Sequence, residues 1–178
     1  DHKEPDGFEN LRTAVQSLSP GAHVVFAGEV LSARGLIKAD TGALNPFVPT
    51  GDVPYYPYHL PPVSLAGLNV PIITCYPGAP TSILDGCENA DGIVVEGLGG
   101  GNVSPEVGEA LADLSMPIVL STSVPFGKVD FAYGGPGGGN TLGKFGVIPS
   151  GWLRAGQARI ALAVALRAGI DPAEVIGA

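Results

Sequence analysis

Short apolar runs that alternate with amphipathic segments constrain the fold of this chain more than any other feature of its sequence. The predicted strands are residues 70–75, 92–95 and 117–121, and the predicted helices between them are residues 81–89 and 104–114. Strands that are apolar along almost their whole length are typical of a parallel sheet with helices on both faces. We therefore expect an α/β fold with a small doubly wound parallel sheet.

A long helical pattern follows this alternation. It covers residues 153–168 and is closed by Gly169, a residue type that commonly ends helices, and a short final turn comes after it. Strands and helices of this number can bury a core of their own. We assign residues 68–178 to one complete C-terminal α/β domain.

Residues 1–50 contain too few elements to close a sheet. The sequence predicts a helix over residues 7–18, a strand from His23 with a bent or hairpin-like continuation, and a loop with a short helical turn over residues 35–51. We interpret this region as the tail of an N-terminal α/β domain whose other strands come from an upstream segment or another chain. The proline-rich residues 51–67 are the predicted linker.

The charge balance excludes two classes of partner. The chain has 9 Lys and Arg against 17 Asp and Glu, a net charge of −8, which is the wrong sign for a nucleic acid or an anionic membrane. No apolar stretch reaches the roughly 18 residues that a membrane span requires. We expect a soluble protein with no nucleic-acid and no membrane partner, and favour a cytoplasmic location.

The sequence predicts neither a metal nor a nucleotide cofactor. Cys75 and Cys87 are too few and too far apart for a Cys–His metal site. Residues 97–102, GLGGGN, lie where a dinucleotide fingerprint would lie, but Asn102 replaces its third glycine. Residues 138–144 have P-loop spacing but continue with Phe in place of Ser or Thr. A nucleotide-binding domain is therefore the weakest functional hypothesis.

Several segments follow one another in an order and spacing that resemble the L-asparaginase family of amidohydrolases. They are GLIKADTGALNPF, YPGAP, GIVVEGLGGGNVSPE, STSVPFGKV, YGGPGGG, GVIPSGWL and QARIALAVAL. The resemblance extends from about Gly7 to the last helix. It implies hydrolysis of the side-chain amide of asparagine, or more slowly glutamine, by a threonine nucleophile assisted by a second Thr, a Lys and an Asp.

The resemblance implies an active-site role for two residues of this chain. Lys38, within GLIKADT, falls where the family places its catalytic lysine, a proton relay. Asn102 falls where the family places an Asn that reaches into the active site of an adjacent subunit and holds the substrate. Without the resemblance, Lys38 is a solvated surface charge, and Asn102 is a turn residue that caps the helix at Ser104.

The family's catalytic threonines and Asp belong to a segment upstream of this one, and the chain has no Thr-Gly-Gly-Thr turn. We therefore expect the part of an asparaginase-like amidohydrolase that lacks the nucleophile, inactive alone and forming a homo-oligomer or completed by a second chain. The alternative is a non-catalytic asparaginase-fold module for amino-acid binding or assembly. Should the isolated chain be active, the nucleophile candidates are Thr41, Thr50, Ser121 and Thr122.

Overall fold

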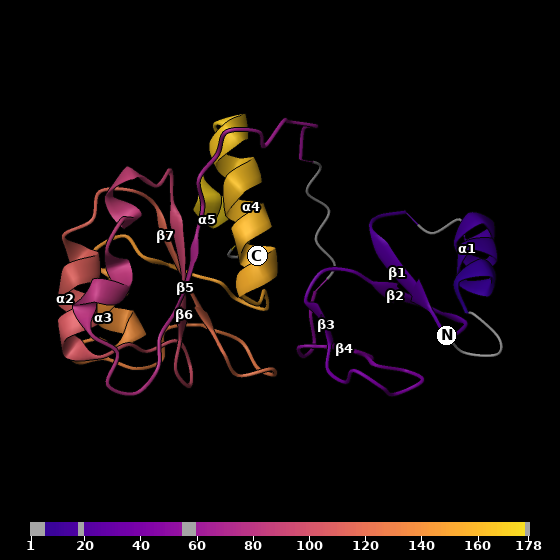
Figure 1. The fold of residues 1–178 in the computed structure, drawn as a ribbon, viewed down its shortest axis with the longest axis horizontal. Coiled ribbons are helices and arrows are strands. Elements are labelled where there is room, and N and C mark those ends of the chain that lie inside the picture. Colours follow the sequence, from indigo (N-terminus) through magenta and orange to yellow (C-terminus); the bar gives the residue numbers. More distant parts are fainter. Residues whose placement is uncertain (1–5, 18–19, 55–59, 177–178) are drawn as a thin grey trace.

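The computed structural model describes residues 6–17, 20–54 and 60–176. Figure 1 shows a larger part, a sheet with helices on both sides, and a smaller part made by the first fifty residues. The division into residues 1–50, 51–67 and 68–178 stays a prediction, and part of the predicted linker lies outside the described residues.

Four parallel strands form the sheet of the larger part. They are β5 (Ile72–Thr74), β6 (Ile93–Gly97), β7 (Ile118–Thr122) and β8 (Ile148–Pro149), in the spatial order β5-β6-β7-β8. Every residue of β7 is buried, because the sheet is covered on both faces. The predicted α/β fold with a parallel sheet is confirmed.

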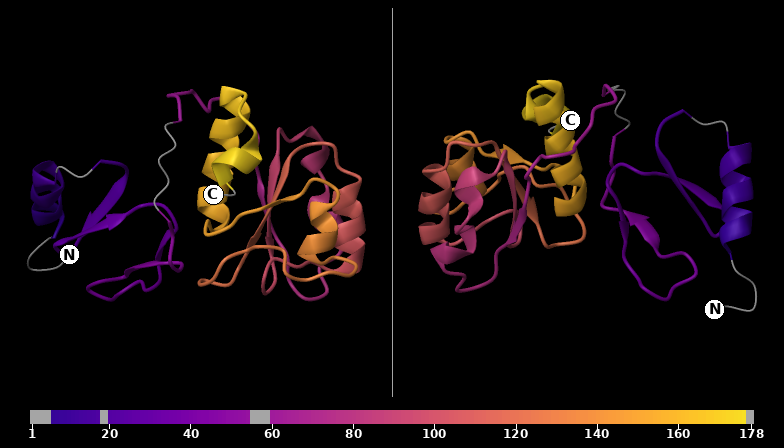
Figure 2. Two further views of the ribbon diagram at one scale, coloured as in Figure 1. Left: turned by 180° about the vertical axis from the view of Figure 1, so that it is seen from behind. Right: turned by 45° about the horizontal axis from the view of Figure 1, so that its top comes forward.

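Helices cover the two faces of this sheet. Figure 2 shows α2 (Pro105–Ala112) and α3 (Gly139–Gly143) on one face, and α4 (Ala155–Ala168) and α5 (Pro172–Ile176) on the other. Alternate residues of β6 therefore enter different cores. Val95 packs in the same cluster as Leu111 of α2, whereas Val94 packs in the same cluster as Leu162 of α4. Each of these side chains is fully buried, which accounts for the nearly continuous apolar runs in the sequence.

The helix predicted over residues 81–89 is wrong. The chain forms two separate 3-10 turns there, η1 (Thr81–Leu84) and η2 (Cys87–Asn89). Gly86 lies between them with a φ of 85°, a left-handed conformation that ends a helix. The structure also places the short helix α3 in the glycine-rich segment, where the sequence predicted none.

The loop predicted over residues 35–51 is instead an antiparallel hairpin of β3 (Leu36–Lys38) and β4 (Phe47–Pro49). The carboxylate of Asp40 folds the turn between them by accepting hydrogen bonds from the backbone N–H of Gly42 (2.7 Å) and Ala43 (2.8 Å). Strands of three residues are too short to show a period of two in the sequence.

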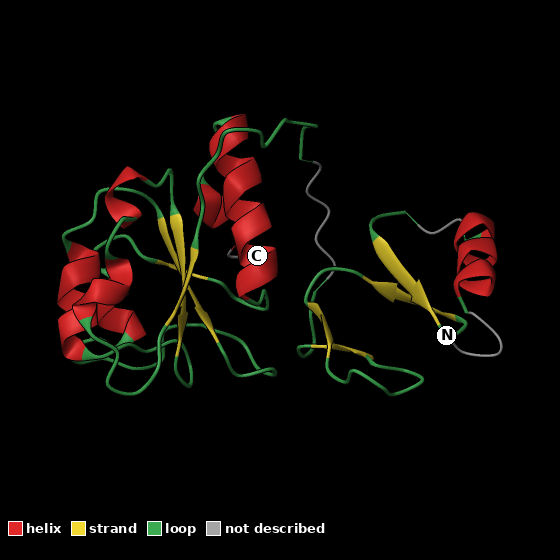
Figure 3. Cartoon of the chain, in the orientation of Figure 1, coloured by secondary structure: helices red, strands yellow, loops and turns green. Residues whose placement is uncertain are grey.

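The rest of the smaller part is α1 (Gly7–Gln16) with a second hairpin, β1 (His23–Phe26) and β2 (Glu29–Ser32), shown in Figure 3. The sequence indicated this hairpin. The apolar residues Phe8, Leu11 and Val15 of α1 are 75%, 63% and 74% exposed. Within the described residues, β1 pairs only with the antiparallel β2. That further strands of this domain come from an upstream segment or another chain stays a prediction.

Candidate functional site

Two loops meet at the carboxyl ends of β6 and β7. The first begins at Leu98, whose backbone N–H donates to the carbonyl oxygen of Asn102 (2.8 Å). The second loop follows Thr122, whose Oγ1 donates to the carbonyl oxygen of Gly99. The backbone N–H of Ser123 in turn donates to the carbonyl oxygen of Gly97 (3.1 Å). The glycine-rich residues 97–102 therefore lie at the carboxyl edge of the sheet.

Asn102 is half-buried in this loop. In the described part of the chain its side chain makes no hydrogen bond. The helix that follows is capped by Ser104, whose Oγ accepts the backbone N–H of Val107 at 3.3 Å. The helix-capping role considered for Asn102 is therefore wrong, and its amide keeps a donor and an acceptor for another group.

Close backbone packing shapes this loop. A Cβ atom at Gly97 would lie 2.7 Å from the carbonyl oxygen of Asn102, so a larger residue would push the loop open. Gly101 has a φ of 89°, a conformation that glycine adopts without steric cost. The glycines that resembled a dinucleotide fingerprint are accounted for by this tight turn.

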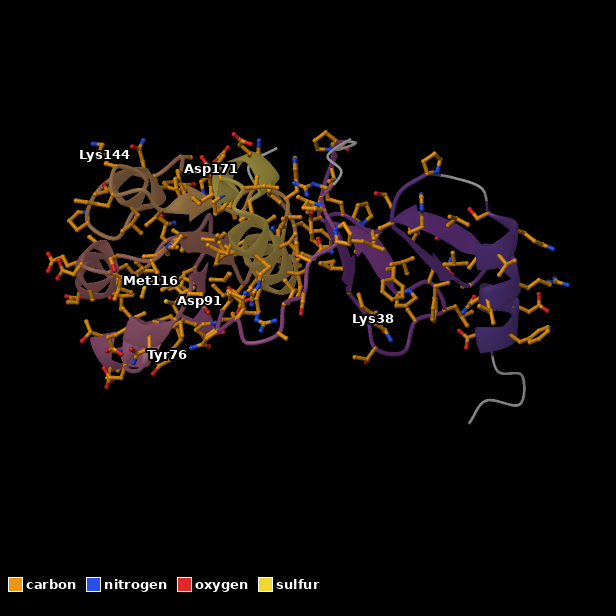
Figure 4. The ribbon with its side chains drawn as sticks, turned by 90° about the horizontal axis from the view of Figure 1, so that it is seen from above. Lys38, Tyr76, Asp91, Met116, Lys144 and Asp171 are labelled. Atoms are coloured by element: carbon orange, nitrogen blue, oxygen red, sulfur yellow. The ribbon has the colours of Figure 1, made fainter. Side chains whose placement is uncertain are left out.

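Lys38 is the last residue of β3 and is exposed. The backbone N–H groups of Gly42 and Ala43 hold the pKa of Asp40 below its usual range, and the charge of Lys38 lowers that pKa further. Figure 4 shows Lys38 on the smaller part of the molecule, apart from the helical layers of the larger part. Among the described residues, no hydrogen bond joins Lys38 to Asn102.

The hairpin that carries Lys38 is joined to the larger part through the side chain of Gln157 in α4. The Oε1 atom of Gln157 accepts the backbone N–H of Gly35 at 2.8 Å. Its Nε2 atom donates to the carbonyl oxygens of Ala33 and Leu36, both at 3.0 Å. Both the oxygen and the nitrogen of this amide thus fix the backbone immediately before and at the start of β3.

A second connection runs through Arg154, which precedes α4. Its Nε donates to the carbonyl oxygen of Pro125 (3.3 Å), and its Nη2 donates to that of Gly127. The backbone N–H of Gly127 donates to the carbonyl oxygen of Thr50 (2.8 Å), beyond the end of β4. Burial lowers the pKa of Arg154. Sequence reasoning did not identify Gln157 or Arg154, because a polar residue at a helix start gives no sign of a distant partner.

The larger part matches the glutaminase/asparaginase C-terminal domain over residues 69–177. The chain belongs to the asparaginase family. A probable L-asparaginase of Deinococcus radiodurans is 34% identical over 195 residues, which cover 96% of this chain and 60% of that protein. The solved thermostable L-asparaginase from Thermococcus kodakarensis matches with a TM-score of 0.75 and 26% identity, covering 98% of this chain and 61% of that one. The chain thus spans about 60% of the length of these relatives.

Three of the four nucleophile candidates in this asparaginase-family chain use their hydroxyl groups in hydrogen bonds to the backbone. Thr50 and Ser121 are fully buried, and Thr122 is 3% exposed. Each donates to a backbone carbonyl oxygen, the first two to Trp152 (2.9 Å) and Leu153 (3.2 Å). A buried hydroxyl that lacks an adjacent base is a weak nucleophile, so these residues serve the fold. The fourth, Thr41, lies exposed in the turn between β3 and β4.

The described residues contain no group of three or more His, Cys, Asp or Glu side chains that could hold a metal ion. Their helices are all too short or too polar to cross a membrane.

Cys75 and Cys87 are both free and buried, and burial raises the pKa of each thiol. These thiols belong to the apolar core beside η1 and η2.

Proposed function

We propose that this chain is part of an asparaginase-like amidohydrolase, which converts L-asparagine and water into aspartate and ammonia. The observation that carries this proposal is the 34% identity to a probable L-asparaginase across 96% of the chain. That match spans both the hairpin with Lys38 and the loop with Asn102. The threonine nucleophile comes from a segment that this chain does not contain.

Lys38 is proposed to relay the proton in this reaction. The threonine oxygen attacks the side-chain amide carbon, and its proton passes by way of the lysine to the leaving nitrogen, which departs as ammonia. Water then hydrolyses the acyl-enzyme and restores the threonine. The exposed position of Lys38 at the end of β3 leaves its ammonium accessible to a nucleophile from another segment.

Asn102 is proposed to bind the substrate of a neighbouring subunit. Its side-chain amide offers a donor and an acceptor without adding charge. No hydrogen bond within the described residues uses these groups. This role requires an oligomer, and the glycine-rich edge of the sheet is where the second copy would bind.

A non-catalytic module is the second candidate function. The exposed apolar side chains of α1, with Phe8 75% exposed, favour an assembly role, because an apolar helix face of this kind is normally covered by another element. In that case the chain would bind a small amino acid or a partner without hydrolysing an amide.

The two candidate functions predict different results in one assay. The isolated chain should release no ammonia from L-asparagine, whereas the same chain joined to an asparaginase N-terminal segment with its Thr-Gly-Gly-Thr turn should release it. Ammonia is measured enzymatically, and asparagine binding by calorimetry. Binding by the completed protein without turnover favours the non-catalytic module, and ammonia release by the pure isolated chain would contradict a nucleophile supplied from elsewhere.

Asn102→Ala should raise the KM of the completed enzyme about tenfold, the factor expected for the loss of one substrate hydrogen bond. Its melting temperature should not change, because the side chain makes no hydrogen bond in the described part of the chain. Ser104→Ala is the matched control. It removes the cap of α2 and should cost about 1 kcal/mol of stability without changing KM. A loss of stability from Asn102→Ala with KM unaltered would make Asn102 a structural residue.

A further inference from the structure

The start of α4 contacts the hairpin that carries Lys38 and the loop that is hydrogen-bonded to the turn of Asn102. Figure 1 shows α4 between the sheet and the smaller part of the molecule. We propose that Gln157 and Arg154 are positioning residues for the amidohydrolase reaction. Gln157 holds the strand of Lys38, and Arg154 holds the loop that supports the turn of Asn102. The inference rests on the proposed function for the roles of Lys38 and Asn102.

Gln157 acts on the backbone that leads into the strand of Lys38. Its three hydrogen bonds, at 2.8, 3.0 and 3.0 Å, go to Gly35, Ala33 and Leu36. Gly35 has a φ of 64°, and a Cβ atom there would lie 2.6 Å from the side chain of Val53. The segment therefore has little room to move. Since β3 is only three residues long, its fixed start determines where Lys38 at its end lies.

Arg154 acts on the other proposed site residue through one intermediate loop. It binds the carbonyl oxygens of Pro125 and Gly127, three and five residues into the loop that begins after Thr122, the last residue of β7. The near end of this loop is bonded to the glycine turn through Thr122 and Ser123. Nη1 of Arg154 is buried without a hydrogen-bond partner within the described residues. The two carbonyl oxygens are therefore what holds the guanidinium in place.

The helix itself provides a fixed base for both contacts. Ala155, Ala158 and Leu162 are buried against the sheet, in the same core cluster as Val94 of β6 and Val119 of β7. Residues three apart lie on neighbouring positions of a helix surface. Arg154 and Gln157 can therefore hold the loop and the hairpin in a defined position relative to the same sheet.

Hydrogen exchange of single amides, followed by NMR on the chain itself, tests the holding role. Gln157→Leu should speed exchange of the Gly35 amide about tenfold, the factor for one typical hydrogen bond, and leave the Gly127 amide unchanged. Arg154→Met should speed exchange of the Gly127 amide, which donates to Thr50 and whose carbonyl oxygen binds Arg154, and should leave the Gly35 amide unchanged. Arg159→Met removes a similar contact on the same helix, to the carbonyl oxygen of Val70 at 2.6 Å, and should affect neither amide.

Kinetics of the completed enzyme test the positioning role. Gln157→Leu should lower kcat about tenfold with little change in KM, because it releases the proton relay, and Arg154→Met should raise KM about tenfold with little change in kcat. Arg159→Met should change neither. Exchange that rises equally at all amides, or kinetic changes that only follow the loss of stability, would overturn the proposal. A completed wild-type protein without activity would instead contradict the proposed function, and the exchange pattern would then decide the holding role alone.

Discussion

Lys38→Met should lower the kcat of the completed enzyme by about a hundredfold to ten-thousandfold, the range that a positioned acid or base contributes. The methionine side chain has nearly the length of lysine but cannot carry a proton. KM should change little, because the ammonium serves proton transfer more than recognition. Stability should be preserved, since Lys38 is exposed. Ammonia release over a range of asparagine concentrations gives both constants.

Lys144→Met is the control for this substitution. Lys144 is also exposed, and Figure 4 places it in the larger part of the molecule, away from Lys38. The Lys144→Met substitution should leave kcat and KM at their wild-type values. Full turnover in the Lys38→Met enzyme would contradict the catalytic role and would show that Lys38 is an ordinary surface lysine.

The sequence predicted the central strands of the larger part because buried strands on both faces require apolar residues, and these are visible in the sequence. β6 and β7 are covered on both faces, so the first three residues of each strand, IVV and IVL, are apolar on both sides and form a continuous apolar run. The hairpin of β3 and β4 left no such pattern. Its strands are three residues each, and its turn depends on hydrogen bonds from Gly42 and Ala43 to one carboxylate, that of Asp40.

The residues of the candidate site likewise include two that the sequence predicted and two that it did not. Lys38 and Asn102 were predicted through a resemblance of whole motifs, because neither residue has a local pattern that distinguishes it from a surface or turn residue. Arg154 and Gln157 could not be predicted. The hydrogen-bond partners of Gln157 lie 121 to 124 residues earlier in the chain, and only the folded structure brings them together.

The glycine-rich segment YGGPGGG carried the family resemblance, and the structure gives the physical reason for one of its glycines. Gly137 has a φ of 75°, and a Cβ atom there would lie 2.3 Å from the carbonyl oxygen of Val103 and 2.8 Å from that of Ser104. Its own carbonyl oxygen accepts the N–H of Val103 at 3.0 Å. The segment is thus packed backbone to backbone against the start of α2, directly after the loop of Asn102.

Gly137→Ala should therefore destabilise the chain by about 3 kcal/mol. Roughly 1–2 kcal/mol comes from the left-handed backbone conformation, and the rest from the overlap with backbone atoms, which no side-chain rotation can relieve. Urea unfolding followed by circular dichroism measures this loss.

Gly135→Ala separates the two contributions. Gly135 has a φ of 89° but open space where a Cβ atom would lie, so this variant should lose only the conformational part, roughly 1–2 kcal/mol. Equal losses in the two variants would show that the contact between Gly137 and the start of α2 gives way without cost. A larger loss at Gly137 means that the packing of this segment fixes where α2 begins, and with it the loop of Asn102 that precedes it.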